Sequence, residues 1–423
     1  MNKKPQQPNW QTKKLGEICD LQNCYAFSSK DYVEGSNTMN FRMSQIRPDG
    51  SVDLDNNPKY LPDSYAKVYK DFLLKDGDIV IAMTDMATET KILGVPTIVK
   101  TDDRNLLLNQ RVGKLYNLNE RTVCIPFLKY VLNSQQVNQY YKSLGRGGLQ
   151  INISKQDILN VEIPLPPIAE QKRIVKNLDG VFEGISKARE NTEKNLKNTR
   201  EFFESYLQSV FVNPKKDWEE KKLGDEKLLE MIDGDRGKNY PKKSDFLDKG
   251  HCLFLNTKNV RQYGFDFKTT MFISQQKDSL LRKGKLQRND VVMTTRGTIG
   301  NLGLYSDGVK YNNIRINSGM LIFRPNTKAI LPEYLFKILY SDITKTQINR
   351  HVSGAAQPQL PIKTLVNFII PVPKSLHEQK QIVKKLDALS EETKKLEKIY
   401  QKKLDDLDEL KKSILKKVFS GEL

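Results

Sequence analysis

The sequence of 423 residues lacks any long apolar run, so no segment predicts a membrane-spanning helix. Its first ten residues, MNKKPQQPNW, also lack the apolar core of a secretory signal peptide. Hydrophobic residues make up 38% and charged residues 28%, which is typical of a soluble protein. We therefore expect a soluble, cytoplasmic protein, and its length predicts more than one domain.

Cysteine and histidine are scarce, and they form neither a CxxC pair nor another spacing typical of metal ligands. These residues are Cys19, Cys24, Cys124, Cys252, His251, His351 and His377. His251 precedes Cys252 directly, but adjacent residues make a poor ligand pair. We predict structural or surface roles for all seven residues and no metal site in this chain.

A nucleotide-binding GxxxxGK[ST] loop is also absent, so the sequence does not predict nucleotide hydrolysis by this chain. The run Asn57-Pro58-Lys59-Tyr60 is similar to the Asn-Pro-Pro-Tyr loop of amino-methyltransferases. However, Lys59 stands where that loop has proline, and no glycine-rich cofactor loop precedes it. The methyltransferase interpretation is therefore weak.

A nuclease pattern gives the main catalytic alternative. Asp63 follows Pro62, and Glu89 and Lys91 follow later, which satisfies a loose PD…ExK pattern. In such sites the carboxylates hold Mg²⁺ and the lysine assists the attacking water. Because the pattern is so degenerate, we keep a metal-dependent DNA nuclease only as the alternative function.

The net charge of +18 is concentrated in one part of the chain. Residues 214–374 contain 28 Lys and Arg against 16 Asp and Glu, a net charge of +12. The net charge is +3 for residues 1–167, +1 for 168–213 and +2 for 375–423. A basic domain suits a polyanionic partner, because binding to phosphates releases counterions. Charge therefore favours nucleic acid, although general basicity is an open alternative.

Two stretches, residues 168–212 and 376–419, have apolar or small residues at alternating steps of three and four. In the first stretch these are Ile174, Leu178, Val181, Ile185, Ala188, Thr192, Leu196, Thr199, Phe203, Tyr206 and Val210. In the second they are Ile382, Leu386, Leu389, Thr393, Leu396, Tyr400, Leu404, Leu407, Leu410, Ile414 and Val418. This spacing predicts an antiparallel coiled coil of two helices, each about 65 Å long. Separate helices that pack on globular domains are the alternative.

The chain repeats itself with a period of about 208 residues. The matching pairs are residues 9–17 with 217–225, 75–80 with 287–292, 125–132 with 331–339, 148–166 with 355–373 and, more loosely, 109–112 with 313–316. The repeat predicts four parts: globular domains at 1–167 and 214–374, each followed by a helical region, at 168–213 and 375–423. Antiparallel helices would relate the two halves by a pseudo-two-fold axis.

Each globular part has short strand-like runs between turn residues, at 78–83, 95–99, 291–295 and 318–323. Proline-started short helices are expected near residues 125 and 331. We predict a mixed α/β (α+β) fold for both copies. Two diverged copies of one fold can contact separate stretches of one duplex, so the predicted DNA target is asymmetric.

The chain resembles the specificity (S) subunit of type I restriction-modification systems over essentially its whole length. The resemblance rests on the start signatures at 10–16 and 218–224, and on IPLPPIAEQKRIV at 163–175 and IPVPKSLHEQKQIV at 370–383. It implies two target-recognition domains that each read one half of a bipartite DNA site. It also implies helical regions that set the unread spacer, and a subunit without catalytic activity.

The resemblance further implies partners and their cofactors. Two methyltransferase (modification) subunits would bind S-adenosylmethionine and methylate adenine, and restriction subunits would use ATP and Mg²⁺ to translocate and cleave DNA. This chain itself would hold no cofactor. We expect the methyltransferase subunits to dock on the long helices and near Glu170-Gln171 and Glu378-Gln379, although these motifs could also cap the helix starts.

Glycine-containing loops with guanidinium or carboxamide side chains suit close approach to DNA and hydrogen bonding to base edges. The candidate DNA-binding residues of this kind are Lys91, Arg111, Arg146, Gly147, Gly148, Gln150, Asn152, Arg296, Gly297, Thr298, Arg350, Gln357 and Gln359. Ordinary solvated turns are the alternative for each position. A third hypothesis is a coiled-coil scaffold without a DNA role, which predicts no salt-dependent binding to duplexes.

Overall fold

In the computed structural model, residues 10–22, 25–262, 264–351 and 358–420 are described. The chain forms two compact units. Unit 1 comprises Met1–Glu193 and Gln401–Leu423, and unit 2 comprises Lys194–Tyr400. Because this division passes through both long helices, it does not test the predicted domain boundaries, which stay a prediction.

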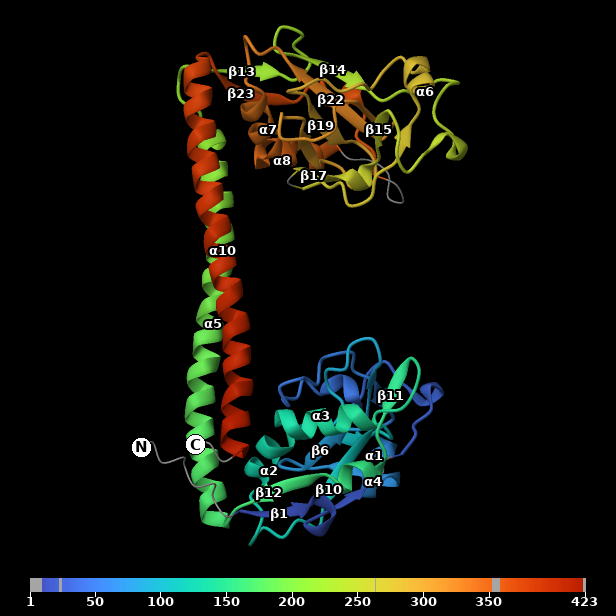
Figure 1. The fold of residues 1–423 in the computed structure, drawn as a ribbon, viewed down its shortest axis with the longest axis vertical. Coiled ribbons are helices and arrows are strands. Elements are labelled where there is room, and N and C mark those ends of the chain that lie inside the picture. The colour runs from blue at the N-terminus through green and yellow to red at the C-terminus, as the bar shows by residue number, and fades with distance from the viewer. Residues whose placement is uncertain (1–9, 23–24, 263, 352–357, 421–423) are drawn as a thin grey trace, which may run out of the picture. The chain divides into compact units, whose positions relative to one another are not determined.

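Unit 1 contains strands that pair mostly antiparallel. Helices lie beside these strands (Figure 1). One sheet has the order β2 (Asp20–Gln22), β10 (Val112–Tyr116), β6 (Ile79–Ala82) and β8 (Pro96–Ile98). A second sheet has the order β4 (Tyr60–Leu61), β3 (Thr38–Phe41), β9 (Asn105–Leu108) and β5 (Leu73–Leu74). Shorter ladders join β1 (Gln11–Lys14) to β12 (Glu162–Leu165) and β7 (Thr84–Met86) to β11 (Gln150–Asn152).

The helices of unit 1 are α1 (Ser64–Val68), α2 (Ile125–Leu132), α3 (Gln135–Leu144), α4 (Lys155–Leu159) and parts of α5 (Ile168–Val212) and α10 (Leu376–Phe419). Strand β6 is buried on both faces. Ile79 and Ile81 belong to the core that includes α2, α3 and the long helices, whereas Val80 and Ala82 belong to the core on the other face. A strand covered on both sides explains the continuous apolar run in the sequence.

Unit 2 repeats this plan. Its central sheet has the order β14 (Leu229–Asp233), β22 (Met320–Pro325), β19 (Val291–Thr294) and β20 (Leu302–Leu304). The other pairings join β18 (Phe272–Ile273), β15 (Cys252–Leu255) and β21 (Ile314–Ile316), then β13 (Trp218–Lys222) and β23 (Ile369–Pro373), and β16 (Val260–Arg261) and β17 (Gly264–Phe265). The remaining helices are α6 (Gln275–Leu280), α7 (Pro332–Tyr340), α8 (Asp342–His351) and α9 (Ile362–Leu365).

These elements confirm the predicted fold class, strand-rich runs and proline-started helices. The repeated start signature also has a structural reason. Gly16 approaches Leu159 so closely that an added Cβ would lie 3.2 Å from its carbonyl oxygen, and at Gly224 it would lie 2.9 Å from the carbonyl oxygen of Val366. An added Cβ would therefore clash at Gly224 and be tightly packed at Gly16, where the chain in each copy crosses the segment before the last strand.

One predicted match within the repeat was wrong. The backbone N–H of Asn109 bonds to Phe41 after parallel strands β3 and β9, and the N–H of Asn317 bonds to Leu255 after parallel strands β15 and β21. Asn109 therefore corresponds to Asn317, not to Asn313. The match was based on the arginine that both segments contain, Arg111 and Arg315. However, Arg315 lies inside β21 and its guanidinium is buried, so it is not the counterpart of Arg111.

The long helices pair antiparallel in each unit. In unit 1, Ile174 and Leu178 near the start of α5 share a core with Leu415 and Phe419 near the end of α10. The predicted seam is largely confirmed, with Thr192, Leu386, Thr393 and Leu404 buried.

Three seam predictions were wrong, since Val181, Leu396 and Leu410 are 46%, 40% and 47% exposed. Near these positions, charged side chains contribute to the contact between the two long helices instead. Glu397 pairs with Arg200 at 3.0 Å, and Lys411 lies over the Phe182 ring at 5.4 Å. No helix among the described residues combines the length and apolarity needed to cross a bilayer.

Candidate nucleic-acid interface

In unit 1, three neighbouring chain segments hold several predicted DNA-binding residues. The backbone N–H of Met83 donates to the carbonyl of Arg111 at 2.9 Å, and the N–H of Ile153 donates to the carbonyl of Met83 at 3.0 Å. Arg111 and Asn152 therefore belong to segments on either side of the chain at Met83 and Thr84. The buried Thr84 hydroxyl donates to the Asn152 side-chain oxygen at 2.6 Å, which fixes that carboxamide.

Arg146 to Asn152 form a tight, exposed turn beside these segments. The two end residues exchange backbone hydrogen bonds of 3.1 and 2.9 Å. Gly147 has φ +138°, and an added Cβ would lie 1.9 Å from the Gln150 carbonyl oxygen, so only glycine fits there. The exposed Gly148 has no such restriction. Leu149 at the tip is 84% exposed, so the turn projects into solvent.

Asp85 orders the loop that carries Lys91, a role that the sequence did not reveal. Its buried carboxylate accepts backbone N–H bonds from Met86 at 2.7 Å, Ile92 at 2.5 Å and Leu93 at 3.1 Å. Lys91 pairs with Glu89 at 2.9 Å, and both side chains are more than half exposed. Such a surface pair contributes little to stability, so Lys91 can exchange its partner for a phosphate.

Unit 2 has the same arrangement with different side chains. Thr295 donates its N–H to Gly319 at 2.8 Å, and Leu360 donates to Thr295 at 3.0 Å. These bonds match those of Met83 and Ile153 in unit 1. Arg296 forms an isolated β-bridge with Gln359, as Thr84 pairs with Asn152.

We call these three protein segments the reading frame of each unit, meaning the backbone frame that presents the candidate DNA-reading side chains and not a codon frame. They are residues 83–84, 111 and 152–153 in unit 1, and 295–296, 319 and 359–360 in unit 2. Position by position, Thr84, Arg111 and Asn152 of unit 1 correspond to Arg296, Gly319 and Gln359 of unit 2. Each frame contains one arginine, but on a different segment, and one carboxamide on the same segment.

The turn after Arg296 is held closely. Gly297 has φ +70° and donates its N–H to the Pro358 carbonyl at 3.2 Å. The hydroxyl of Thr294 donates to the Thr298 carbonyl at 2.5 Å and accepts from the Asn301 N–H at 3.0 Å. These bonds give a short, ordered loop in which Gly297 and Thr298 are exposed.

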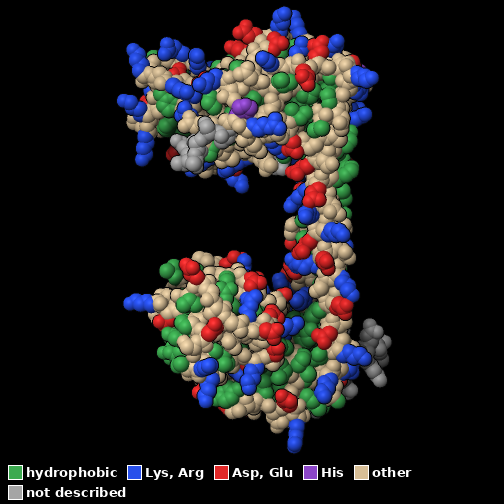
Figure 2. Space-filling view, turned by 180° about the vertical axis from the view of Figure 1, so that it is seen from behind, with side chains coloured by type: hydrophobic (Ala, Val, Ile, Leu, Met, Phe, Trp, Pro, Cys, Tyr) green, Lys and Arg blue, Asp and Glu red, His purple; other side chains and the backbone are tan. Residues whose placement is uncertain are grey.

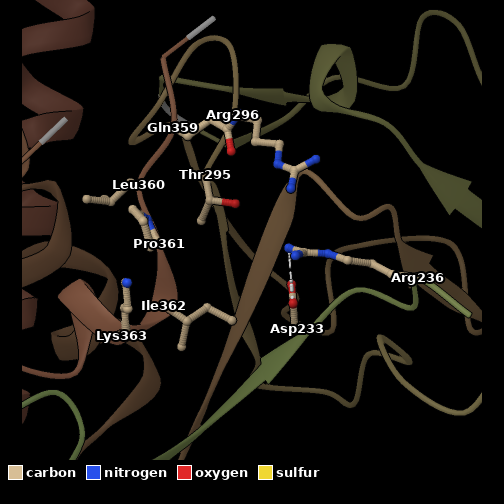
Figure 3. Close-up of a pocket in the computed structure, with 9 residues that line it drawn as sticks. All are labelled: Asp233, Arg236, Thr295, Arg296, Gln359, Leu360, Pro361, Ile362 and Lys363. Carbon is tan, nitrogen blue, oxygen red and sulfur yellow. Dashed lines mark hydrogen bonds and ion pairs between the residues drawn. The ribbon is translucent and has the colours of Figure 1, made fainter. Parts of the chain in front are cut away.

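A cavity of about 300 Å³ opens beside the unit 2 frame. It is lined by Asp233, Arg236, Thr295, Arg296, Gln359, Leu360, Pro361, Ile362 and Lys363. Figure 3 shows the guanidinium groups of Arg236 and Arg296 pointing into the same space. The lining contains three cationic side chains, Arg236, Arg296 and Lys363, and one carboxylate, Asp233, which pairs with Arg236 at 3.1 Å. This excess of positive charge suits an anionic ligand such as a phosphate.

Sequence reasoning missed Arg236 and Lys363, because only folding brings them to Arg296 and Gln359. The excess charge of residues 214–374 was the available signal, but it did not single out positions. Figure 2 shows Lys and Arg side chains spread over much of this globular part, shown at the top of the view.

Some predicted residues are not brought together by the frame. Arg350 lies exposed in the last turn of α8 and does not line the cavity. Gln357 lies outside the described residues. Gln150 is half-buried in β11, opposite Met86.

The catalytic look-alikes have structural roles here. Asp63 accepts a hydrogen bond from the Thr38 hydroxyl at 2.8 Å, and Asn57 has φ +53° in a turn. Burial raises the pKa of the Cys19 and Cys252 thiols to about 12, which keeps them protonated and unreactive. In the described part of the chain, no cluster of three or more His, Cys, Asp or Glu could hold a metal ion.

The two glutamines expected at a docking surface are not exposed. Gln171 and Gln379 are both 0% exposed and bond to backbone groups of their own units. Glu170 pairs with Arg173 at 2.7 Å, and Glu378 pairs with Lys215 at 2.7 Å. The glutamine side chains are therefore unavailable to a partner in this conformation.

Comparisons with known proteins give a consistent assignment. The model of the type I restriction modification DNA specificity domain matches the chain twice, over residues 7–197 and 215–405. The type I restriction enzyme EcoBI specificity subunit of Escherichia coli is 26% identical over 342 residues, which cover 75% of this chain and 69% of that protein.

Solved structures have the same fold. A chain from work on the complex assembly and conformational transition of the type I R-M system has a TM-score of 0.74 and 21% identity, with 100% of both chains covered. The HsdS subunit from Thermoanaerobacter tengcongensis has a TM-score of 0.59 and 21% identity, with 98% of both chains covered. At this identity the likeness supports the fold alone.

The family match covers both halves of the chain, as the internal repeat requires. Specificity subunits recognise DNA and are not catalytic, and no observation supports the nuclease alternative. This chain belongs to the type I restriction-modification DNA specificity family.

Proposed function

We propose that this chain is the subunit that selects the DNA target of a type I restriction-modification complex. Recognition domains at 1–167 and 214–374 would each read one half of an asymmetric bipartite site, and the helical regions would set the unread spacer. The duplicated reading frame carries this proposal. The same backbone arrangement occurs in both units, whereas the side chains that it presents differ.

The frame side chains suit direct readout in the major groove. Arginine forms paired hydrogen bonds with guanine O6 and N7, and asparagine or glutamine with adenine N6 and N7. We assign Arg111 and Arg296 to guanine, and Asn152 and Gln359 to adenine. Because the arginine lies on a different segment in each frame, the two halves of the target would differ in the order of their bases.

The other candidates suit contacts to the DNA backbone. Lys91 and Arg146 in unit 1, with Arg236 and Lys363 in unit 2, would neutralise phosphates, and each such contact adds to the salt dependence of binding. Gly147, Gly148 and Gly297 would allow close approach of the chain to a strand. Gln150, Thr298, Arg350 and Gln357 complete the proposed interface as polar contacts.

The expected partners are two methyltransferase subunits with S-adenosylmethionine, which methylate adenine, and ATP- and Mg²⁺-dependent restriction subunits, in the cytoplasm. This chain would hold no cofactor. Exposed apolar side chains on the long helices support a docking role: Phe202 on α5 is 62% exposed and Ile399 on α10 is 59% exposed. We propose that the docking surface includes these two side chains, because phenylalanine is enriched at protein interfaces.

A domain exchange tests the proposal. Residues 10–160 are replaced by the matching domain of another family member, and the chimera is expressed with its methyltransferase partner. We expect one half of the methylated sequence to change and the other half to stay the same. Independent reading would be refuted if both halves changed, or if neither did.

A further inference from the structure

Each long helix begins with a buried glutamine that bonds to three backbone groups. In unit 1, Gln171 Oε1 accepts from Cys124 N–H at 2.8 Å, and its Nε2 donates to Thr122 O at 2.9 Å and Pro166 O at 2.8 Å. These partners belong to the loop before α2 and to the segment that follows β12. One side chain thus connects the long helix to two other parts of its domain.

Unit 2 repeats the arrangement atom by atom. Gln379 Oε1 accepts from Leu331 N–H at 2.8 Å, and its Nε2 donates to Ala329 O at 3.0 Å and Pro373 O at 3.1 Å. Neither Cys124 nor Leu331, the N-cap residues of α2 and α7, supplies a side-chain cap to its own helix. The glutamine from the long helix therefore satisfies backbone groups at the start of the short helix.

A second contact lies two turns further along each long helix. The Tyr130 hydroxyl of α2 donates to Asp179 Oδ1 at 2.5 Å, and Lys337 of α7 pairs with Asp387 at 2.6 Å. Burial and the Asp179 carboxylate raise the pKa of Tyr130, so its hydroxyl remains a donor. The chemistry differs between the units, whereas the position is the same.

The end of the other long helix completes the attachment. Phe127 of α2 packs against Phe419 with ring centroids 5.7 Å apart, and Tyr334 of α7 packs against Phe211 at the same distance. The interplanar angles are 74° and 75°. In both units, then, the short helix is held between the start of one long helix and the end of the other.

We propose that Gln171 and Gln379 are positioning residues that fix the direction of each recognition domain on the long helices, and so restrict the spacer length that the two domains accept. This inference rests on the proposed function. Three backbone bonds to two separate segments define an orientation, which a single contact cannot do. A tilt of about 5° at the helix start would move a point about 65 Å along the helix by roughly 6 Å, nearly two base-pair steps.

The test compares Gln171→Ala and Gln379→Ala with Lys172→Ala and Lys380→Ala, which change exposed neighbouring residues. Each full-length chain is assembled with its methyltransferase partner and offered duplexes whose two half-sites are separated by the native spacer or by one or two base pairs more or fewer. We expect the glutamine variants to recognise the same two half-site sequences. The ratio of their affinities for the native and the altered spacers should be about tenfold smaller than in the parent. The lysine variants should match the parent.

A second readout needs no DNA. Spin labels are attached at two exposed positions of unit 1, Lys176 on α5 and Lys100 in the recognition domain. The distribution of distances between the two labels should broaden in Gln171→Ala and stay narrow in Lys172→Ala. If the alanine variants do not fold, Gln171→Met and Gln379→Met provide the same test, since methionine keeps the length of the side chain and removes only the glutamine hydrogen bonds.

The outcomes separate the two proposals. Unchanged spacer preference and an unchanged distance distribution in folded variants would overturn the positioning role. A parent complex that binds without regard to sequence or spacer would instead refute the proposed function, while a broadened distance distribution would still support the attachment.

Discussion

Arg296 and Lys363 line the same cavity but are assigned different roles, which gives a direct test of the reading frame. Arg296 lies half-buried next to Gln359, where its guanidinium can form a bidentate pair with guanine. Lys363 is exposed and offers a single ammonium group suited to a phosphate. Their replacement by alanine should therefore affect different properties of binding.

We expect Arg296→Ala to cost about 1–3 kcal/mol on the correct target, a loss of roughly 5- to 150-fold in affinity. A duplex in which the contacted guanine is already replaced should bind the variant and the parent about equally, because it offers no pair to lose. Lys363→Ala should weaken binding to all duplexes alike. It should also reduce the slope of log K against log salt by about 0.9, the value for one phosphate contact.

Competition binding by the assembled complex measures both effects, with the target and its single-base variants at several salt concentrations. Lys227→Ala is the control, because this lysine is exposed in the same domain and does not line the cavity. If Arg296→Ala weakened every duplex equally, Arg296 would be a backbone contact and the frame would not read bases. Loss of discrimination in Lys363→Ala would likewise contradict the assigned roles.

Three further predictions concern stability and assembly. Burial alone would raise the pKa of Asp278, but hydrogen bonds from Lys285 and Arg315 outweigh it and lower the pKa below its ordinary value. The Asp278 carboxylate therefore stabilises unit 2 at pH values above its unfolded pKa of about 3.9, and this contribution is lost as the pH falls through the lower folded pKa. In urea denaturation between about pH 5 and 2, the free energy of unfolding should therefore depend less on pH in Asp278→Asn than in the parent. Phe211→Ala removes a fully buried ring and should lower the free energy of unfolding by about 3–5 kcal/mol in urea denaturation. Phe202→Ala, at a 62% exposed position, should change it by about 0.5 kcal/mol or less but weaken co-purification of the methyltransferase; normal co-purification would exclude Phe202 from the docking surface.

Periodicity predicted the long helices well, because a two-helix seam needs an apolar side chain about every half heptad. It failed at Leu396 and Leu410, where the seam is shared with Glu397 and Lys411. The spacing of apolar residues does not reveal that the aliphatic part of a charged side chain can cover the seam. Strands such as β6 and β19 were predictable because they are covered on both faces.

The candidate site was predictable only in part. Glycine turns and nearby polar residues located the segments that contain Arg296 and Asn152, because backbone conformation leaves a local signal in sequence. Arg236, Lys363 and Asp85 were missed because their roles arise from contacts with distant segments. The Glu-Gln-Lys motif was recognised as either a docking site or a cap at the helix start, but its sequence does not reveal that the Gln171 side chain is buried. Docking near the motif stays a prediction.

Sequencing the methylated DNA of cells that carry the unaltered chain with its methyltransferase partner tests the central claim most directly. Two diverged reading frames predict two short, unlike sequences separated by a spacer of fixed length and free composition, with methylated adenine in the site. A single uninterrupted sequence, a palindrome, or a spacer of variable length would contradict the account.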